Sequence, residues 1–395
     1  MQALAADACE LCRGTNFEIL HRQGFVLPGD QQAHYDVSCC TGCGFTFARN
    51  IPSAAAHDAY YASNTRYTYE GSKNVSPALA RVHSDNFAFV DHYLSSNSPP
   101  LAGKASRVLD VGCATGILLS CFRRAGYEDV LGIDPAPECR PIADRLYGVR
   151  IETAPISSFV PERPFDLVVL SSVIEHLPNA AAALGRIADW VRADGLLFAM
   201  VPDAESFGVD LQEPFLEFSV EHVKFFTRAS LARLMANAGF SPAVQRQDVV
   251  LVNGTSYPAI RAIFSKRPPA TAERAATSDV TPLRDYIARS MAKLATVERT
   301  IDALVRSREP VVVWGVGSLT ARLMATTTME RMNIVGFVDS ASGLHGQRLH
   351  GREIRPPTWL RGRRDTILVS SYVWAEAIRQ TLVQDLAYQG KIVTL

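Results

Sequence analysis

Short apolar runs alternate with longer amphipathic stretches through the middle of the chain. The runs that end in a polar turn are Val108–Leu109, Val130–Ile133, Leu167–Leu170 and Leu196–Val201. A strand covered on both faces of a parallel sheet appears as a continuous apolar run, and a helix connects it to the next parallel strand. The pattern therefore predicts a doubly wound α/β domain, which we place at residues 61–265 together with a preceding helix over 76–94.

The same alternation restarts near the end of the chain. A polar stretch rich in Pro and Ala at 266–278 resembles a linker, and the periodicity that follows it predicts a long helix over 283–305. Apolar runs then recur at Val311–Trp314, Ile334–Val338, Thr366–Val369 and Ile392–Val393. We therefore expect a linker and helix at 266–305 and a second, smaller α/β domain at 306–395.

Composition and charge narrow the possible functions. The chain is 47% hydrophobic and 20% charged, which is typical of a folded globular protein. Its 40 basic and 40 acidic residues cancel, so no overall field favours nucleic acid or an anionic membrane. No apolar run approaches the roughly 20 residues that span a bilayer, and the first residues do not resemble an export signal. We expect a cytoplasmic protein that acts on a small molecule; the oligomeric state stays open.

Cysteine is concentrated at the N-terminus. Cys9-x-x-Cys12 and Cys40-x-x-Cys43 form two pairs that can each present two thiolates to one tetrahedral zinc ion. Cys39 adjoins Cys40, but the spacing selects Cys40. Because four sulfur ligands leave no open coordination position, the ion is expected to be structural. The pattern predicts a zinc-binding module at residues 1–60.

A glycine turn follows the first apolar run of the α/β domain. The run ends in Asp110-Val111-Gly112-Cys113-Ala114-Thr115-Gly116, where glycines let the backbone approach a ligand closely. The next run ends at Asp134-Pro135, where a carboxylate can accept hydrogen bonds from ribose hydroxyls. An acidic residue before the turn suits a cationic amino group better than a pyrophosphate. The candidate cofactor-binding residues are Asp110, Gly112, Cys113, Ala114, Gly116, Asp134 and Pro135.

These motifs, with the later Glu175-His176-Leu177 segment, resemble the class I S-adenosylmethionine (SAM) dependent methyltransferases. The resemblance covers about residues 80–264 and implies a Rossmann-like core with SAM as cofactor. Ala114 stands where a middle glycine is common, and alanine is small enough for SAM to bind. His176 occurs in a segment shared by methyltransferases of many specificities, so a catalytic role and a structural or substrate-lining role are both open. A SAM- or nucleotide-binding protein without turnover is the alternative.

The order of cysteine module, methyltransferase core and C-terminal α/β domain is similar to that of the sugar C-methyltransferases. Their substrates are deoxysugars attached to a nucleotide. The segment Glu221-His222-Val223-Lys224-Phe225-Phe226 matches that family's base segment, so the resemblance implies His222 as the base and Glu221 as its acidic neighbour, with no metal in the reaction. Of the tyrosines between the cysteine module and the core, Tyr69 best matches an active-site tyrosine. We therefore consider His222, Glu221, His176 and Tyr69 as the catalytic candidates.

One departure keeps the reaction type open. Ser219 and Val220 occupy the positions of the family's tyrosine and first histidine. Without that tyrosine, O-methylation of a sugar or related precursor is a close alternative to C-methylation beside a keto group, since both need only a base near the acceptor.

The second α/β domain carries a fingerprint of its own. Gly315 and Gly317 follow its first apolar run and Asp339 ends the next, although Thr320 replaces the third glycine of the dinucleotide pattern. We expect a scaffold that helps to bind the substrate's nucleotide or sugar, with the substrate in a cleft between the two α/β domains.

Overall fold

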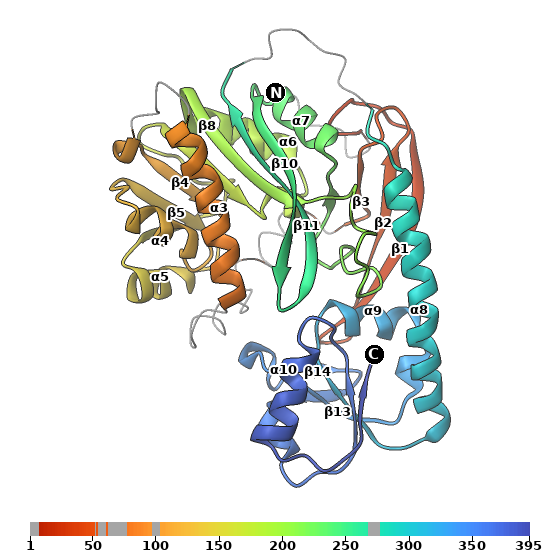
Figure 1. Ribbon diagram of the computed structural model, residues 1–395. Coiled ribbons are helices and arrows are strands. Elements are labelled where there is room, and N and C mark those ends of the chain that lie inside the picture. Colours follow the sequence, from red (N-terminus) through yellow and green to blue (C-terminus); the bar gives the residue numbers. More distant parts are fainter. Residues whose placement is uncertain (1–7, 52, 54–60, 62–76, 97–102, 268–276) are drawn as a thin grey trace.

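The computed structural model describes residues 8–51, 53, 61, 77–96, 103–267 and 277–395. Within those residues it contains three β-sheets, arranged as an N-terminal sheet, a central sheet with helices on both faces, and a C-terminal sheet (Figure 1). The long helix α8 (Thr281–Ser307) runs along one side of the molecule from the N-terminal sheet to the C-terminal domain. No described helix is long and apolar enough to cross a membrane.

The N-terminal sheet is longer than the sequence suggested. It is formed by β1 (Phe17–Leu27), β2 (Gln31–Cys40), β3 (Thr46–Arg49) and β9 (Lys224–Phe225), in that order. All neighbours in it are antiparallel. Since β9 comes from the methyltransferase segment, residues 1–60 do not form this sheet alone. The apolar pattern of the first 50 residues gave no sign of strands of 11 and 10 residues.

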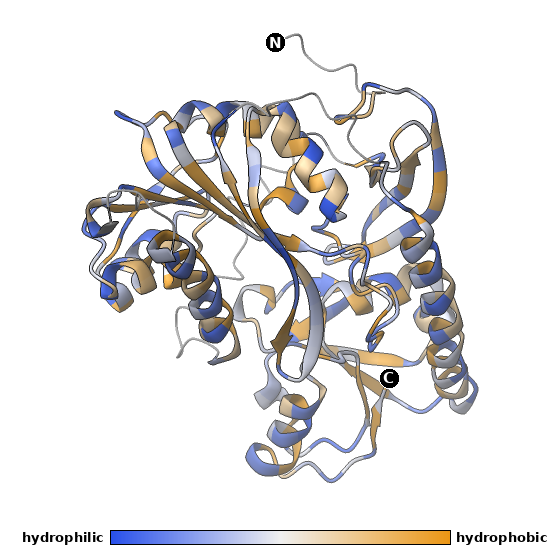
Figure 2. Ribbon diagram, turned by 45° about the horizontal axis from the view of Figure 1, so that its top comes forward, coloured by the Kyte–Doolittle hydropathy of each residue, from blue (hydrophilic) through white to orange (hydrophobic). Residues whose placement is uncertain are grey.

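The central sheet confirms the predicted Rossmann-like α/β core. Its order is β10 (Ser241–Val252), β11 (Thr255–Ser265), β8 (Val191–Pro202), β7 (Phe165–Ser171), β4 (Val108–Val111), β5 (Val130–Asp134) and β6 (Arg150–Thr153). The five strands from β8 to β6 are parallel, whereas β11 and β10 form an antiparallel hairpin at the edge. Figure 2 shows that the central strands are mostly hydrophobic, as expected for a sheet covered on both faces.

Helices cover the two faces of this sheet. One face packs against α3 (Pro77–Ser96), α4 (Ile117–Arg124) and α5 (Cys139–Tyr147), through a core that includes Val90, Phe122 and Ala143. The other face packs against α6 (Ala180–Trp190) and α7 (Arg228–Asn237). Cys9 and Cys43 belong to this second core. The cysteine module therefore packs against the central domain and is not a separate, independently packed domain.

The C-terminal domain is a second α/β unit. Its sheet has the order β14 (Arg348–Leu349), β15 (Arg352–Arg355), β13 (Ile334–Val338), β12 (Val311–Trp314), β16 (Thr366–Val369) and β17 (Ile392–Thr394). All pairs are parallel except β14 with β15. Its helices are α9 (Ser318–Thr326) and α10 (Ala375–Gln380). It also contains the short 3-10 helices η3 (Thr328–Arg331), η4 (Ser342–Leu344) and η5 (Pro357–Leu360) and the π-helical turn η6 (Thr381–Asp385), whereas the 3-10 helices η1 (Gly103–Ala105) and η2 (Ile174–His176) belong to the central domain.

Candidate active site

A cavity of about 630 Å³ opens where the parallel strands of the central sheet end. The turns after β4, β5, β6 and β7 line it. At this point the strand order reverses, because the chain continues from β4 to β5 on one side of the pair and from β7 to β8 on the other. Open α/β sheets bind their ligands in this place. Lining residues include Gly112–Thr115, Asp134, Pro135, Ala154–Ser157, Ser171–Val173, Glu175–Asn179, Glu221, His222, Val250, Val252 and Tyr257.

No described residue beyond Ala259 lines this cavity. The sequence led us to expect the substrate cleft between the two α/β domains, and the cavity instead lies within the first of them. The β10–β11 hairpin, which was not expected from the sequence, contributes Val250, Val252 and Tyr257 to the cavity wall, and the place of the substrate stays a prediction.

The glycine turn after β4 forms the floor of the cavity. Gly112 has a φ of 67°, and a Cβ at this position would lie 2.8 Å from Cγ2 of Val173, so only glycine fits without movement. Gly116 is not among the lining residues. Its φ is 82°, and a Cβ there would lie 2.8 Å from Cγ2 of Val149, so this glycine permits close packing of α4 and does not contact the ligand space.

Ala114 adopts the left-handed conformation with a φ of 47°. A side chain there costs roughly 1–2 kcal/mol relative to the right-handed region, whereas glycine avoids this cost. Ala114→Gly is therefore expected to raise the free energy of unfolding by about 0.5–1 kcal/mol, because part of the gain is lost to the freer unfolded chain. Denaturant melts of both proteins measure this change, and a lower stability of the glycine variant would contradict it.

Asp134 holds the turn closed from the next strand. Its carboxylate accepts hydrogen bonds from the backbone N–H of Ala114 at 2.9 Å and of Ala136 at 2.9 Å. Oδ1 also accepts from the Cys139 thiol at 3.7 Å, whereas Oδ2 keeps a further lone pair with which Asp134 can accept from a ribose while it orders the turn. Asp110 was expected to line the cofactor site, and its position differs from that expectation. It is 3% exposed and not among the lining residues, and burial, followed by the charge of Asp134, raises its pKa well above the usual value.

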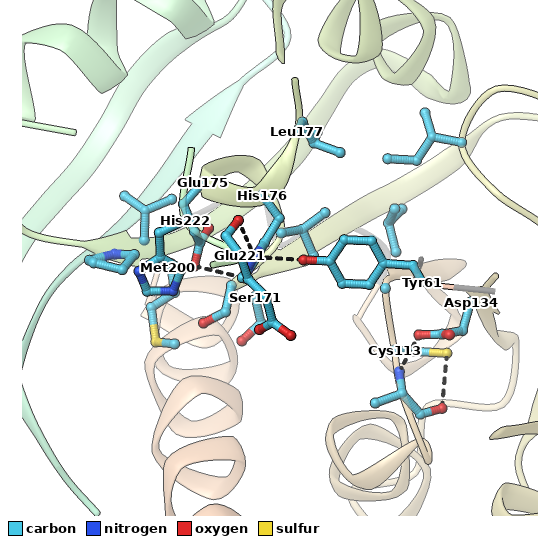
Figure 3. Close-up of a pocket in the computed structure, with 18 of the residues that line it drawn as sticks. Tyr61, Cys113, Asp134, Ser171, Glu175, His176, Leu177, Met200, Glu221 and His222 are labelled. Atoms are coloured by element: carbon cyan, nitrogen blue, oxygen red, sulfur yellow. Dashed lines mark hydrogen bonds and ion pairs between the residues drawn. The ribbon is translucent and has the colours of Figure 1, made fainter. Parts of the chain in front are cut away.

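Two histidines meet at the far end of the cavity (Figure 3). His176 comes from η2, just after β7, and His222 from the segment before β9, and their rings lie 5.0 Å apart at an angle of 67°. Nδ1 of His176 is 3.2 Å from the carbonyl oxygen of Glu221, and Nδ1 of His222 is 3.2 Å from that of Glu217. Because a carbonyl only accepts, the Glu217 contact favours for His222 the tautomer that carries its proton on Nδ1 and leaves Nε2 as a base. Nδ1 of His176 also lies 2.9 Å from the Tyr61 hydroxyl, which can donate or accept, so the contacts of this ring do not select one tautomer.

The carboxyl group beside His222 is Glu217. Its Oε2 lies 3.8 Å from Nδ1 of His222, and burial, followed by the charge of Glu213, raises its pKa to about 8. The sequence pointed to Glu221, which lines the cavity but faces His176 through its backbone carbonyl. In an irregular segment, neighbouring side chains need not share a direction, so adjacency in sequence did not identify the partner.

Glu175 is a second buried carboxyl group at this end of the cavity. It is 1% exposed, neither of its carboxylate oxygens has a hydrogen-bond partner among the described residues, and Oε1 lies 3.8 Å from Nε2 of His176. Burial, followed by the charge of Glu217, raises its pKa to about 8. In the sequence, Glu175 stands out only as part of the Glu175-His176-Leu177 motif, and no pattern points to Glu217.

The histidine pair also has the composition of a cation site. One ligand atom from each of Glu175, His176 and His222 lies within 4.8 Å of the others. Two imidazoles and a carboxylate suit zinc, iron or manganese. A histidine that binds an ion through Nε2 cannot use the same lone pair as a base, so the two roles of His222 exclude one another and can be separated by experiment.

Tyr61 completes the described part of the site. Its hydroxyl oxygen is 2.9 Å from Nδ1 of His176, and it lines the cavity (Figure 3). Tyr69, the tyrosine favoured from the sequence, lies outside the described residues. On the opposite side of the site, the buried Asn86 donates to Ser171 at 3.0 Å and accepts from Arg261 at 2.7 Å.

The four cysteines of the N-terminal pairs come together. Sγ of Cys9 and Cys43 are 3.6 Å apart, Sγ of Cys12 and Cys40 are 3.4 Å apart, and all four lie within 4.8 Å of one another. Sulfur atoms bound to one zinc ion at about 2.3 Å would be separated by similar distances. Cys39 is outside this group, and its thiol donates to the Cys40 carbonyl at 3.7 Å. The residues therefore fit a tetrahedral ion, held by the four cysteines chosen from the spacing.

Comparison with known proteins identifies the core. A family model described as methyltransferase domain matches residues 82–244. A ubiquinone biosynthesis O-methyltransferase from Bordetella avium is 31% identical over 185 residues, which cover 42% of this chain and 72% of that protein. The chain belongs to the SAM-dependent methyltransferases. The predicted class of enzyme is thereby confirmed.

Other relatives of this methyltransferase match shorter segments. A ubiquinone biosynthesis O-methyltransferase from Neisseria meningitidis is 30% identical over 156 residues, which cover 35% of this chain and 66% of that protein. A trans-aconitate 2-methyltransferase from Methylobacterium nodulans is 36% identical over 120 residues, which cover 29% of this chain and 43% of that protein. The methyltransferase thus spans less than two thirds of either relative.

Solved structures and a second family model complete the comparison. The 1,6-didemethyltoxoflavin-N1-methyltransferase of Burkholderia thailandensis is 21% identical to this methyltransferase, with a TM-score of 0.41, and the match covers 56% of this chain and 96% of that one. The magnesium protoporphyrin IX methyltransferase of Synechocystis is 16% identical, with a TM-score of 0.39, and the match covers 54% and 97%. A family model described as C2185-like, N-terminal, matches residues 307–393.

Proposed function

We propose that the protein transfers a methyl group from SAM to a small molecule that loses a proton to His222. The observation that carries this proposal is the position of the histidine pair, which lines the same cavity as the glycine turn after β4. One end of the cavity offers the backbone turn and the Asp134 carboxylate for SAM. The other end offers an imidazole for the acceptor.

The reaction then follows from the tautomer of His222. With its proton on Nδ1 and directed at the Glu217 carbonyl, Nε2 takes the proton from the acceptor. The electron pair left on the acceptor forms the new bond to the methyl carbon, and the carbon–sulfur bond of SAM breaks with its electrons going to sulfur. The products are the methylated acceptor and S-adenosylhomocysteine. The Glu217 carbonyl oxygen, 3.2 Å from Nδ1, continues to accept the Nδ1 proton of the imidazolium that forms and so keeps the ring oriented.

For the substrate we propose a nucleotide-activated sugar, methylated at a carbon beside a keto group. The resemblance in domain order, the Glu221-His222 segment and the cysteine cluster support this proposal. In such a sugar the carbonyl acidifies the neighbouring C–H, so that an imidazole suffices as base.

O-methylation is the second candidate, and Ser219 favours it. Its hydroxyl oxygen accepts from the backbone N–H of His222 at 3.1 Å and of Glu221 at 3.3 Å, so this side chain caps a turn and offers no phenol to an enolate. The relatives from Bordetella avium and Neisseria meningitidis are also named as O-methyltransferases.

Three measurements test the proposal. Calorimetry is expected to show S-adenosylhomocysteine binding at micromolar concentration or tighter, and no such binding would refute it. Incubation with SAM and a panel of keto and hydroxy sugar nucleotides, read by mass and NMR, then locates the methyl group. A C-methylating enzyme also exchanges the acidic C–H of the acceptor with deuterated solvent, because enolate formation is a separate step. An O-methylating enzyme has no reason to do so.

A further inference from the structure

The buried cation of Arg322 joins the C-terminal domain to the segment that carries the catalytic candidates. Arg322 lies in α9 and is 1% exposed. Its guanidinium donates to the carbonyl oxygens of Pro214 at 3.0 Å, Phe215 at 2.7 Å and Phe218 at 2.9 Å. It also donates to the Gln23 side chain of β1 at 3.2 Å and lies 3.6 Å from the Glu213 carboxylate.

Other groups hold the same segment from both sides. The hydroxyl of Tyr286 accepts from the Glu217 N–H at 3.0 Å, and that of Ser290 accepts from the Phe215 N–H at 3.2 Å, both from α8. From β2, the hydroxyl of Tyr35 donates to the Ser219 carbonyl at 2.9 Å. Residues 213–222 are therefore held between the N-terminal sheet and the C-terminal domain.

The backbone of this segment would not keep its shape alone. Phe215 has a φ of 56°, in the left-handed region that a bulky aromatic residue rarely adopts. Such a conformation persists where the surroundings fix it. Here the N–H of Phe215 donates to Ser290 of α8, and its carbonyl accepts from Arg322 of α9. The Glu217 carbonyl faces Nδ1 of His222, so the orientation of this peptide group selects the tautomer of the ring.

We propose that Arg322 is a positioning residue for methyl transfer: by fixing residues 213–218, the C-terminal domain sets the ring orientation and tautomer of His222. This inference rests on the proposed function, in which His222 takes the proton. It gives the C-terminal domain a role in the reaction although no described residue of that domain lines the cavity. The guanidinium suits the task because its planar set of donors can bind several carbonyls at once, which an ammonium cannot match.

The test compares Arg322→Met and Arg322→Lys with the wild type. Arg352→Met is the control, since Arg352 donates to the Ile334 carbonyl within its own domain at 3.1 Å. We expect the affinity for S-adenosylhomocysteine to change less than twofold in all variants. We expect kcat, with the acceptor found from the panel, to fall at least tenfold in Arg322→Met, less in Arg322→Lys and not in Arg352→Met.

The deciding readout is the tautomer of His222, measured by nitrogen-15 NMR and assigned with His222→Gln. The wild type should carry the proton on Nδ1, and both Arg322 variants should lose this preference. A folded Arg322→Lys protein with the wild-type tautomer and kcat would overturn the proposal, even if Arg322→Met fails to fold. If the tautomer shifts while His222→Ala keeps full activity, the positioning by Arg322 stands and His222 as the base is refuted.

Discussion

Replacement of His222 by alanine is expected to lower kcat by roughly 10²–10⁴-fold, the usual contribution of a general base. The affinity for S-adenosylhomocysteine should stay within about twofold, because the proposed cofactor site, the turn after β4 with Asp134, does not include this ring. A loss confined to kcat is the signature of an interaction made in the transition state. Initial rates at saturating SAM, with calorimetry on the same preparations, measure both quantities.

Asp134→Ala is the matched comparison for this prediction. It removes the proposed acceptor for a ribose and the hydrogen bonds from Ala114 and Ala136, so SAM affinity should fall while kcat at saturation falls less. Full activity of His222→Ala would show that another residue is the base, with His176 and Tyr69 as the next candidates.

A chelation experiment separates the base from a metal ligand. If chelation abolishes turnover and a divalent cation restores it while the cysteine cluster keeps its metal, His222 acts as a ligand beside Glu175 and His176.

The sequence predicted those parts of the fold that depend on local pattern. Each buried parallel strand is an apolar run, and the helices predicted at 76–94 and 283–305 correspond to α3 and α8 within two residues at each end. The β10–β11 hairpin was missed because β10 is an edge strand with mostly polar or half-exposed positions. Its turn did carry a signal, since Asn253-Gly254, with φ values of 50° and 80°, is a common hairpin sequence.

In the candidate site too, local pattern predicted some residues and long-range contacts place the others. Gly112 and Ala114 lie in the turn that follows β4, and Asp134 is the last residue of β5, so the sheet itself places them, and the apolar runs that form these strands are visible in the sequence. Glu217 reaches His222 only because Arg322, Tyr286 and Tyr35 shape the segment between them, and these contacts join residues far apart in the chain. No local pattern encodes such an arrangement, which explains why Glu221 was chosen over Glu217.

Loss of the metal from the cysteine cluster is expected to unfold the N-terminal sheet. Structural zinc sites contribute about 10–16 kcal/mol of apparent binding free energy, more than a short sheet can replace by packing. We therefore expect one zinc ion per chain, and we expect Cys12→Ser to lose it and to melt at a markedly lower temperature. Cofactor affinity should change little, because the turn after β4 lies outside this sheet.

The neighbouring cysteines provide the control for this prediction. Successive residues of a strand point to opposite faces, so Cys39 and Cys40 cannot both join the cluster. Cys39→Ser should keep the zinc ion, whereas Cys40→Ser should lose it, as measured by elemental analysis of protein purified without chelator. The reverse outcome, or no zinc in the wild type, would contradict the assignment.

Zinc loss should also lower kcat while the cofactor still binds, because Tyr35 of this sheet donates to the Ser219 carbonyl. This contact links the metal to His222 through residues 213–222.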